Sequence, residues 1–151
     1  MSSPTSRTLE YERKQGHTVQ VVEYWHAFSR RRVDLFNCID VISLTTSRIK
    51  GIQCTSGSNH SARQTKAQGI PAIVEWLRCG GQFEVQSWRK NSKGKWIHRI
   101  TRGYLDDKDK LNFRDITDEE AIPQTRATQE PSDRLIALPT VGVRCQCHGD
   151  G

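Results

Sequence analysis

Two apolar runs joined by a short polar turn constrain the fold of this 151-residue chain more than any other feature. The first run covers residues 35–44, the second covers residues 49–55, and the turn lies between them. Apolar and β-branched residues recur in both runs, which predicts two antiparallel strands joined by a hairpin. Asp40 lies inside the first run. A carboxylate in a buried strand costs free energy unless it has a partner such as a cation, so Asp40 is a candidate functional residue.

The register of this hairpin predicts which side chains accompany Asp40. If residues 46–47 form a two-residue loop, Asp40 faces Gln53, and directly opposed residues project to the same face of a sheet. Thr55 shares that face with Gln53, because side chains alternate with period two along a strand. We therefore expect Asp40, Gln53 and Thr55 to converge on one patch, which a slip of one residue would disperse.

The remaining patterns predict an α/β fold in which helices flank a mixed central sheet. In chain order, we expect a helix over residues 6–15, a strand over 18–25, a basic loop over 26–33, the two strands above, a helix over 61–79, and strands over 82–89 and 95–101. Gly69 and Pro71 are expected to divide the second helix, because Pro suits the first position of a new helical segment. Residues 5–105 would form the domain, and the charged, Pro-dotted residues 106–151 are predicted to be mostly disordered.

Charge and composition indicate the class of partner. The net charge of +6 and the pI of about 9.3 favour an anionic partner, most commonly nucleic acid, although the charge can also be incidental. No run is long enough to span a bilayer, and no hydrophobic signal-peptide segment follows Met1. Five cysteines without framework spacing fit a reduced compartment. We expect an intracellular protein with no membrane partner.

The order of elements, together with the segments 34–40 and 51–59, resembles the PD-(D/E)XK nuclease superfamily. The similarity is to the small phage and bacterial proteins related to Holliday-junction resolvases and Mrr-type nucleases, and it extends over about residues 6–101. It implies a restriction-endonuclease-like core with the order α-β-β-β-α-β-β. It also implies a cytoplasmic location, in a bacterium or a phage-infected cell.

This resemblance implies hydrolysis of DNA phosphodiester bonds, with Mg²⁺ or Mn²⁺ as cofactor and branched DNA among the candidate substrates. Asp40 matches the metal-binding Asp of the family, and Gln53 stands where the family has Glu, Asp or Gln. A carboxamide oxygen can bind Mg²⁺ but brings no charge. Glu23, on the first strand, is a further candidate ligand.

Thr55 departs from the family pattern, which places a catalytic Lys at this position. A Thr hydroxyl carries no charge and stabilises developing negative charge poorly. Lys66 or Arg63, one turn apart on the following helix, could supply the missing cation. We therefore expect Asp40, Gln53, Thr55 and Lys66 to form the catalytic set.

Other acids and a terminal cluster leave alternatives open. Glu10 and Glu12 fit either the acid that the family often carries on its first helix or a solvated helix face. Asp34 fits either a residue that orients the arginine loop or a surface acid. The segment 145–148 (CQCH) offers three candidate zinc ligands, too few for a closed structural site, so an unstructured chain end is the alternative.

Basic and polar residues near the expected sheet end are candidates for DNA contact. They are Arg31, Arg32, Ser56, Ser58, Asn59, Arg63 and Lys66. Residues 56–60 lead into a helix N-terminus, which suits either phosphate binding or plain capping. The four tryptophans, Trp25 among them, are expected to pack in the core or on the sheet rather than against bases.

We expect a metal-dependent DNA endonuclease or resolvase-like enzyme. The missing Lys favours one alternative, a degenerate member of the fold that binds DNA or protein without catalysis. A small phage structural or accessory protein with incidental basic charge is a third reading. Resolvases of this type are often dimers, so a homodimer is included in the expectation, although no dimer surface can be read from the sequence.

Overall fold

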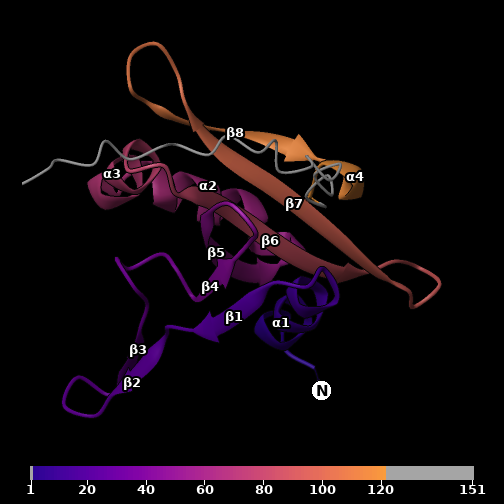
Figure 1. The fold of residues 1–151 in the computed structure, drawn as a ribbon. Helices are drawn as coiled ribbons and strands as arrows, with labels where there is room; N and C mark the ends of the chain where they lie inside the picture. The colour runs from indigo at the N-terminus through magenta and orange to yellow at the C-terminus, as the bar shows by residue number, and fades with distance from the viewer. Residues whose placement is uncertain (1, 122–151) are drawn as a thin grey trace, which may run out of the picture.

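A mixed six-stranded sheet organises residues 2–121, the part of the chain that the computed structural model describes (Figure 1). Its strands, in spatial order, are β1 (Thr18–Val21), β4 (Val41–Leu44), β5 (Ile49–Ser56), β6 (Gln82–Lys90), β7 (Trp96–Leu105) and β8 (Leu111–Ile116). Strands β5 and β6 are parallel, and the other neighbouring pairs are antiparallel. A separate two-stranded sheet pairs β2 (Tyr24–His26) with β3 (Arg31–Val33). The predicted α/β class is confirmed.

Helices cover both faces of the large sheet. They are α1 (Pro4–Lys14), the short 3-10 helix η1 (Gly57–Asn59), α2 (His60–Gln68), α3 (Pro71–Arg78) and α4 (Asp118–Ala121). Glu12 of α1 binds Lys50 on β5, whereas His60 of α2 binds Ser87 on β6, which pairs with Thr55 of β5. Since side chains alternate along a strand, α1 and α2 lie on opposite faces.

Local signals place the helix boundaries. The Ser3 hydroxyl caps α1 by accepting the Ser6 N–H at 3.1 Å, and Gly16 ends the helix region with a φ of +81°. The expected division of the second long helix is confirmed, because α2 ends before Gly69 and α3 begins at Pro71. Within residues 2–121, no helix is both long and apolar enough to cross a bilayer.

The hydrophobic core lies on both sides of β5 and fixes the residues that precede β4. On the α2 and α3 side, the core contains Cys38, Ile39, Ala67, Ile73, Phe83, Val85 and Leu111. A Cβ atom at Gly51 would lie 2.6 Å from Cδ1 of Ile39, so glycine lets the Ile39 side chain pack directly on the β5 backbone. The packing of Ile39 holds the adjacent Asp40 against β5.

Two predicted strands are shorter than expected. The strand predicted over 35–44 begins only at Val41, because the preceding residues fold into a tight turn closed by a bridge between Leu35 and Ile39. Phe36 and Asn37 adopt positive φ in this turn, which a strand cannot contain. The strand predicted over 18–25 ends at Val21, and the predicted basic loop 26–33 is largely the β2–β3 hairpin.

The predicted disorder after residue 105 is wrong for its first part. The Asp106 carboxylate accepts the N–H groups of Lys108 and Lys110 and closes a turn, after which β8 pairs with β7 along its whole length. Leu111 and Ile116 are buried. The strand was not predicted because its few apolar residues lie in a stretch rich in charged residues. Residues 122–151, with the remainder of the predicted tail and the cluster Cys145, Cys147 and His148, lie outside the described residues.

Candidate metal centre

The predicted β4–β5 register is confirmed and sets Asp40 opposite Gln53. Val41 pairs with Ile52, so the next residues outward along the two strands meet. The Gln53 Nε2 donates a hydrogen bond to Asp40 Oδ2 at 2.5 Å. The backbone N–H of Cys54 donates to the same oxygen at 2.8 Å. Asp40 and Gln53 are both buried, so each holds the other in place.

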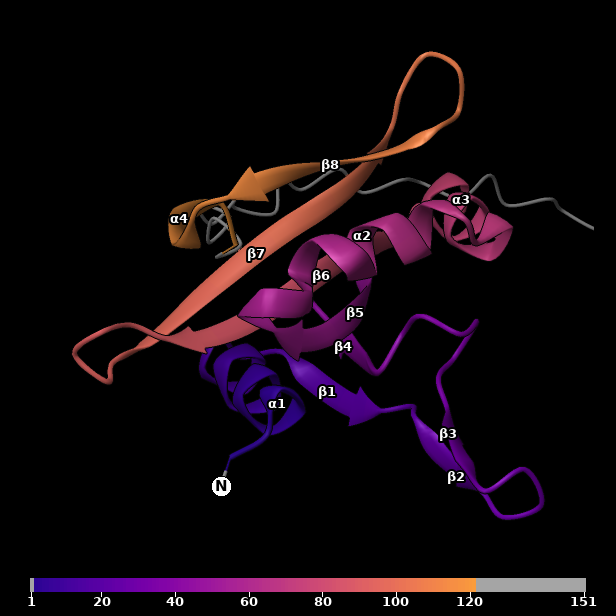
Figure 2. The same ribbon diagram turned by 180° about the vertical axis from the view of Figure 1, so that it is seen from behind.

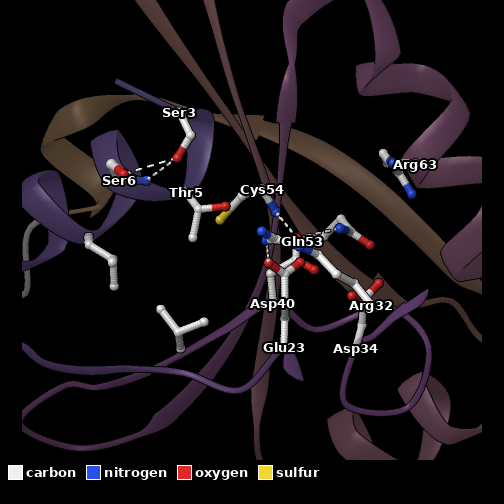
Figure 3. Close-up of a pocket in the computed structure, with 12 residues that line it drawn as sticks. Ser3, Thr5, Ser6, Glu23, Arg32, Asp34, Asp40, Gln53, Cys54 and Arg63 are labelled. Carbon is white, nitrogen blue, oxygen red and sulfur yellow. Dashed lines mark hydrogen bonds and ion pairs between the residues drawn. The ribbon is translucent and has the colours of Figure 1, made fainter. Parts of the chain in front are cut away.

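Two further carboxylates meet Asp40. Glu23 follows β1, Asp34 follows β3 and Asp40 precedes β4, and the carboxylate oxygens of these three residues lie within 4.8 Å of one another (Figure 3). The structure thus brings the predicted ligand Glu23 to Asp40. The reading of Asp34 as a surface acid is wrong, because its side chain is only 18% exposed and faces the other two acids. Its short distance from Asp40 in the chain was the one available signal.

The three acids line a cavity of about 590 Å³ at the end of the sheet (Figure 3). Its wall also contains Ser3, Thr5, Ser6, Leu9, Val21, Arg32, Gln53, Cys54 and Arg63. Burial raises the pKa of Asp40 to about 7, and the charges of Asp34 and Glu23 act in the same direction against the Cys54 N–H, which lowers it. The cavity therefore concentrates negative charge that the chain only partly neutralises.

Gln53 supplies a second, independent sign of a ligand. Its Oε1 atom is buried and has no hydrogen-bond partner among the described residues, although the side chain lines the cavity. A buried acceptor without a partner costs about 1–3 kcal/mol, which a bound cation would remove. Carboxylate and carboxamide oxygens are the ligands that Mg²⁺ and Mn²⁺ favour. The donor set of Glu23, Asp34, Asp40 and Gln53 fits such an ion.

Three cations lie around the acidic cavity. The Arg32 guanidinium forms an ion pair with Glu23, and Lys66 Nζ lies 3.9 Å from Asp34 Oδ2. Arg63 lines the cavity from α2 (Figure 3). The cations expected from the helix after β5 are therefore close to the acids. Long basic side chains that are partly solvent-exposed can turn toward an incoming phosphate.

Comparison of the chain with protein-family models, with curated proteins and with solved structures found no match.

Several predicted site residues do not join the cavity. Thr55 is buried on β5 beside Ser87 and is absent from the cavity wall, so its expected place near the acids is wrong. Thr55 shares a face with Gln53 by strand alternation, but it lies two residues beyond the position opposite Asp40.

The polar segment formed by the end of β5 and by η1 also lies apart from the cavity wall. The Ser56 hydroxyl interacts with Ser58 and accepts a hydrogen bond from Asn59, a local arrangement within the η1 region. Gly57, between them, lines a different cavity with Ser87, Arg89, Ile97 and Arg99. Arg31 is exposed on the β2–β3 hairpin and does not line the acidic cavity.

The two acids of α1 have different fates. Glu10 is solvent-exposed and pairs with Lys14, as a solvated helix face predicts. Glu12 is fully buried and pairs with Lys50. It therefore lies neither on a solvated helix face nor among the three clustered acids. The sequence signal missed here was Lys50 itself, a cation inside an apolar strand.

Proposed function

We propose that the protein is a metal-dependent nuclease that hydrolyses DNA phosphodiester bonds on a restriction-endonuclease-like fold. The observation that carries the proposal is the cluster of Glu23, Asp34 and Asp40 with the unpartnered Gln53 oxygen beside it. Such a donor set binds a divalent ion, and flanking cations suit the anionic backbone of a nucleic acid.

The order of elements supports the same proposal. A helix precedes three antiparallel strands (β1, β4 and β5), and two helices then lead to β6, which runs parallel to β5. This is the core order that the PD-(D/E)XK resemblance implies, with Asp40 immediately before β4 and Gln53 on β5. The β2–β3 hairpin and β8 are additions to that order.

The residues take distinct roles under this proposal. Glu23, Asp34, Asp40 and Gln53 hold Mg²⁺ or Mn²⁺, which, when bound, activates water and polarises the scissile phosphate. Arg63 and Lys66 neutralise charge on the phosphate oxygens, the task that a Lys at position 55 would otherwise perform. Lys66 is held near the centre by Asp34 in the absence of DNA and exchanges this weak contact for phosphate.

The test is cleavage of plasmid, linear and branched DNA in Mn²⁺ and in Mg²⁺. We expect Asp40→Asn to lower the rate at least a hundredfold, and Lys66→Ala combined with Arg63→Ala to lower it about as much, since lost charge stabilisation costs about 10²–10³ in rate. Asp107→Asn, an exposed acid in the turn after β7, is the matched control and should cleave normally. Full activity in Asp40→Asn would refute the metal role of Asp40.

A DNA-binding module that has lost catalysis is the second candidate. The specific observation in its favour is the buried Thr55, which leaves β5 without a cation at the acidic cavity. This candidate predicts that the wild-type protein binds DNA at low salt but cleaves none of the three substrates with either ion. Absence of DNA binding at low salt would contradict both candidates.

A further inference from the structure

The β2–β3 hairpin exposes aromatic side chains that the fold does not use. It projects from the body of the protein as a separate two-stranded sheet (Figures 1 and 2). Tyr24 is 56% exposed, Trp25 is 61% exposed and Phe28, at the tip, is 96% exposed. The expectation that Trp25 packs in the core or on the sheet is therefore wrong. Three large aromatic side chains this exposed on one hairpin indicate a partner.

The charge beside these rings indicates the chemistry of the partner. Arg30, Arg31 and Arg32 follow the tip of the hairpin, and all three are exposed. Proteins that bind single nucleic-acid strands combine cationic residues for the phosphates with aromatic rings on which bases stack. A purely apolar partner would leave the guanidinium groups of Arg30 and Arg31 without a counter-charge, whereas Arg32 already pairs with Glu23. The hairpin is therefore complementary to a ligand that has both planar aromatic rings and negative charge.

The hairpin is connected directly to the metal centre. Its two strands begin just after Glu23 and end just before Asp34, two of the three clustered acids. Trp25 pairs with Arg32 across the hairpin and so shares its face, and Arg32 forms an ion pair with Glu23. The face that carries Trp25 is thus the face that reaches the acids.

A second cavity joins the rings to the acids. It measures about 390 Å³, within the range of ligand pockets, and is lined by Val21, Glu23, Tyr24, Trp25 and Arg32. Of these, Val21, Glu23 and Arg32 also line the acidic cavity, so the two cavities adjoin. A strand whose phosphate lies at the acids would place a neighbouring base beside Trp25.

We propose that the β2–β3 hairpin binds an unpaired nucleotide next to the cleaved phosphate, with Trp25 stacking on its base. The substrate class is then DNA with a single-stranded segment at the cleavage position, because bases in a duplex are already stacked on one another and offer no free face. This inference rests on the proposed nuclease function and specifies its substrate. The tip residue Phe28 holds the continuation of the same strand.

The test measures binding in EDTA, so that it does not depend on cleavage. Wild-type protein should bind a duplex with a single-stranded tail at least tenfold more tightly than the blunt duplex of equal charge. Trp25→Ala should weaken binding to the tailed duplex about tenfold, since stacking of one base contributes about 1–3 kcal/mol, and leave blunt-duplex binding unchanged. Phe28→Ala should weaken tailed-duplex binding in the same direction by less.

Tyr104→Ala is the matched control, because Tyr104 is a comparably exposed ring on β7, outside both cavities. It should leave both affinities unchanged. Equal affinity of the wild type for tailed and blunt DNA, or loss of both affinities together in Trp25→Ala, would overturn the inference. So would conversion of a dimer to a monomer by Trp25→Ala in sedimentation, which would assign the rings to a second copy of the chain.

The same series separates this inference from the proposed nuclease function. Selective loss of tailed-duplex binding in Trp25→Ala, from a protein that cleaves nothing, would support the hairpin and refute catalysis. Cleavage that depends on Asp40 but is equal on tailed and blunt DNA in wild type and Trp25→Ala would support catalysis and overturn the role of the hairpin.

Discussion

Two buried carboxylates that contact β5, Glu12 from helix α1 and Asp40 from the residue before β4, have opposite electrostatic surroundings. Glu12 is 0% exposed and Asp40 is 4% exposed. Lys50 Nζ lies 3.1 and 3.2 Å from the two oxygens of Glu12, which also accept hydrogen bonds from Ser43 and Gln86 at 2.8 Å. Asp40 accepts hydrogen bonds from Gln53 and Cys54 but has two carboxylates as its charged neighbours.

The pKa values of the two groups record this difference. Burial alone would raise the pKa of Glu12, but the Lys50 ammonium, aided by hydrogen bonds that include one from His17, leaves it below the ordinary value. Burial raises the pKa of Asp40 to about 7, with Asp34 and Glu23 adding to the effect. One acid is neutralised by a cation of the chain itself. The other is arranged as if the cation came from outside, which is the physical basis of the proposed metal centre.

The network of charges around Glu12 extends beyond its ion pair with Lys50. Lys50 Nζ also lies 3.3 Å from Glu84, and Arg102 donates to the other oxygen of Glu84 at 2.9 Å. Two carboxylates and two cations therefore alternate through the interior beneath α1. Removal of any one member of this network is strongly destabilising, because it leaves an uncompensated buried charge.

The largest expected effect comes from removing the internal cation. Lys50→Met should lower the free energy of unfolding by about 3–5 kcal/mol, because Glu12 and Glu84 would face one another without the ammonium between them. Urea unfolding monitored by circular dichroism measures this. Lys93→Met, at an exposed position in the β6–β7 turn, should change the free energy by less than about 0.5 kcal/mol.

A double variant keeps this prediction testable if Lys50→Met folds poorly. Adding Glu12→Gln removes one of the two buried charges left without a cation and should restore part of the loss. A loss below about 1 kcal/mol for Lys50→Met alone would contradict the view that this region is neutralised from within.

The second effect concerns the acidic cavity and an external cation. Mn²⁺ at a hundredfold excess over its Kd should stabilise the wild-type protein by about 2.7 kcal/mol, as any ligand specific for the folded state does. Asp34→Asn should abolish most of this stabilisation, measured as the shift in Tm with and without Mn²⁺. Asp107→Asn should retain it. Stabilisation of Asp34→Asn equal to that of the wild type would place the ion elsewhere.

The third effect is a dependence of stability on pH with opposite sign for the two acids. The pKa of Asp40 is about 7 in the folded state against an ordinary 3.8, so the folded state holds a proton that the unfolded state has lost between those values. Its contribution to stability is present below about pH 4 and is lost as pH rises through 7. Glu12, with a lowered pKa, contributes above its ordinary value of 4.5 and loses that contribution as pH falls.

Paired unfolding curves in EDTA isolate the Asp40 contribution. The free energy of the wild type minus that of Asp40→Asn should fall by about 2 kcal/mol between pH 5.5 and pH 8, because other titrating groups cancel in the difference. Glu12→Gln compared with the wild type should show no such fall in that interval. A flat difference for Asp40→Asn would mean that its carboxylate is adequately neutralised by the chain.

The sequence was sufficient for the part of the centre that depends on local register. The length of the turn between the two apolar runs places Asp40 opposite Gln53, and strand alternation then determines which neighbouring side chains share their face. The positions of Asp34 and Glu23 depend on the β2–β3 hairpin, which departs from one end of the sheet and returns to it. No local pattern specifies where such an excursion closes, so the sequence leaves Asp34 open between a residue that orients the arginine loop and a surface acid. Glu12 and Lys50 were missed because they meet only after α1 packs across β5.

The smallest expected effect comes from Arg32, whose guanidinium is the one cation among residues 2–121 that pairs with the clustered Glu23. Its own side chain is 70% exposed, so the ion pair contributes little to folding. Arg32→Met should change the free energy of unfolding by less than about 1 kcal/mol. It should nevertheless tighten Mn²⁺ binding about threefold to fivefold in isothermal titration calorimetry, because the ion no longer competes with a cation for Glu23. The equivalent Arg31→Met should leave Mn²⁺ affinity unchanged, and weaker Mn²⁺ binding in Arg32→Met would show that Arg32 orders the acids rather than competing for them.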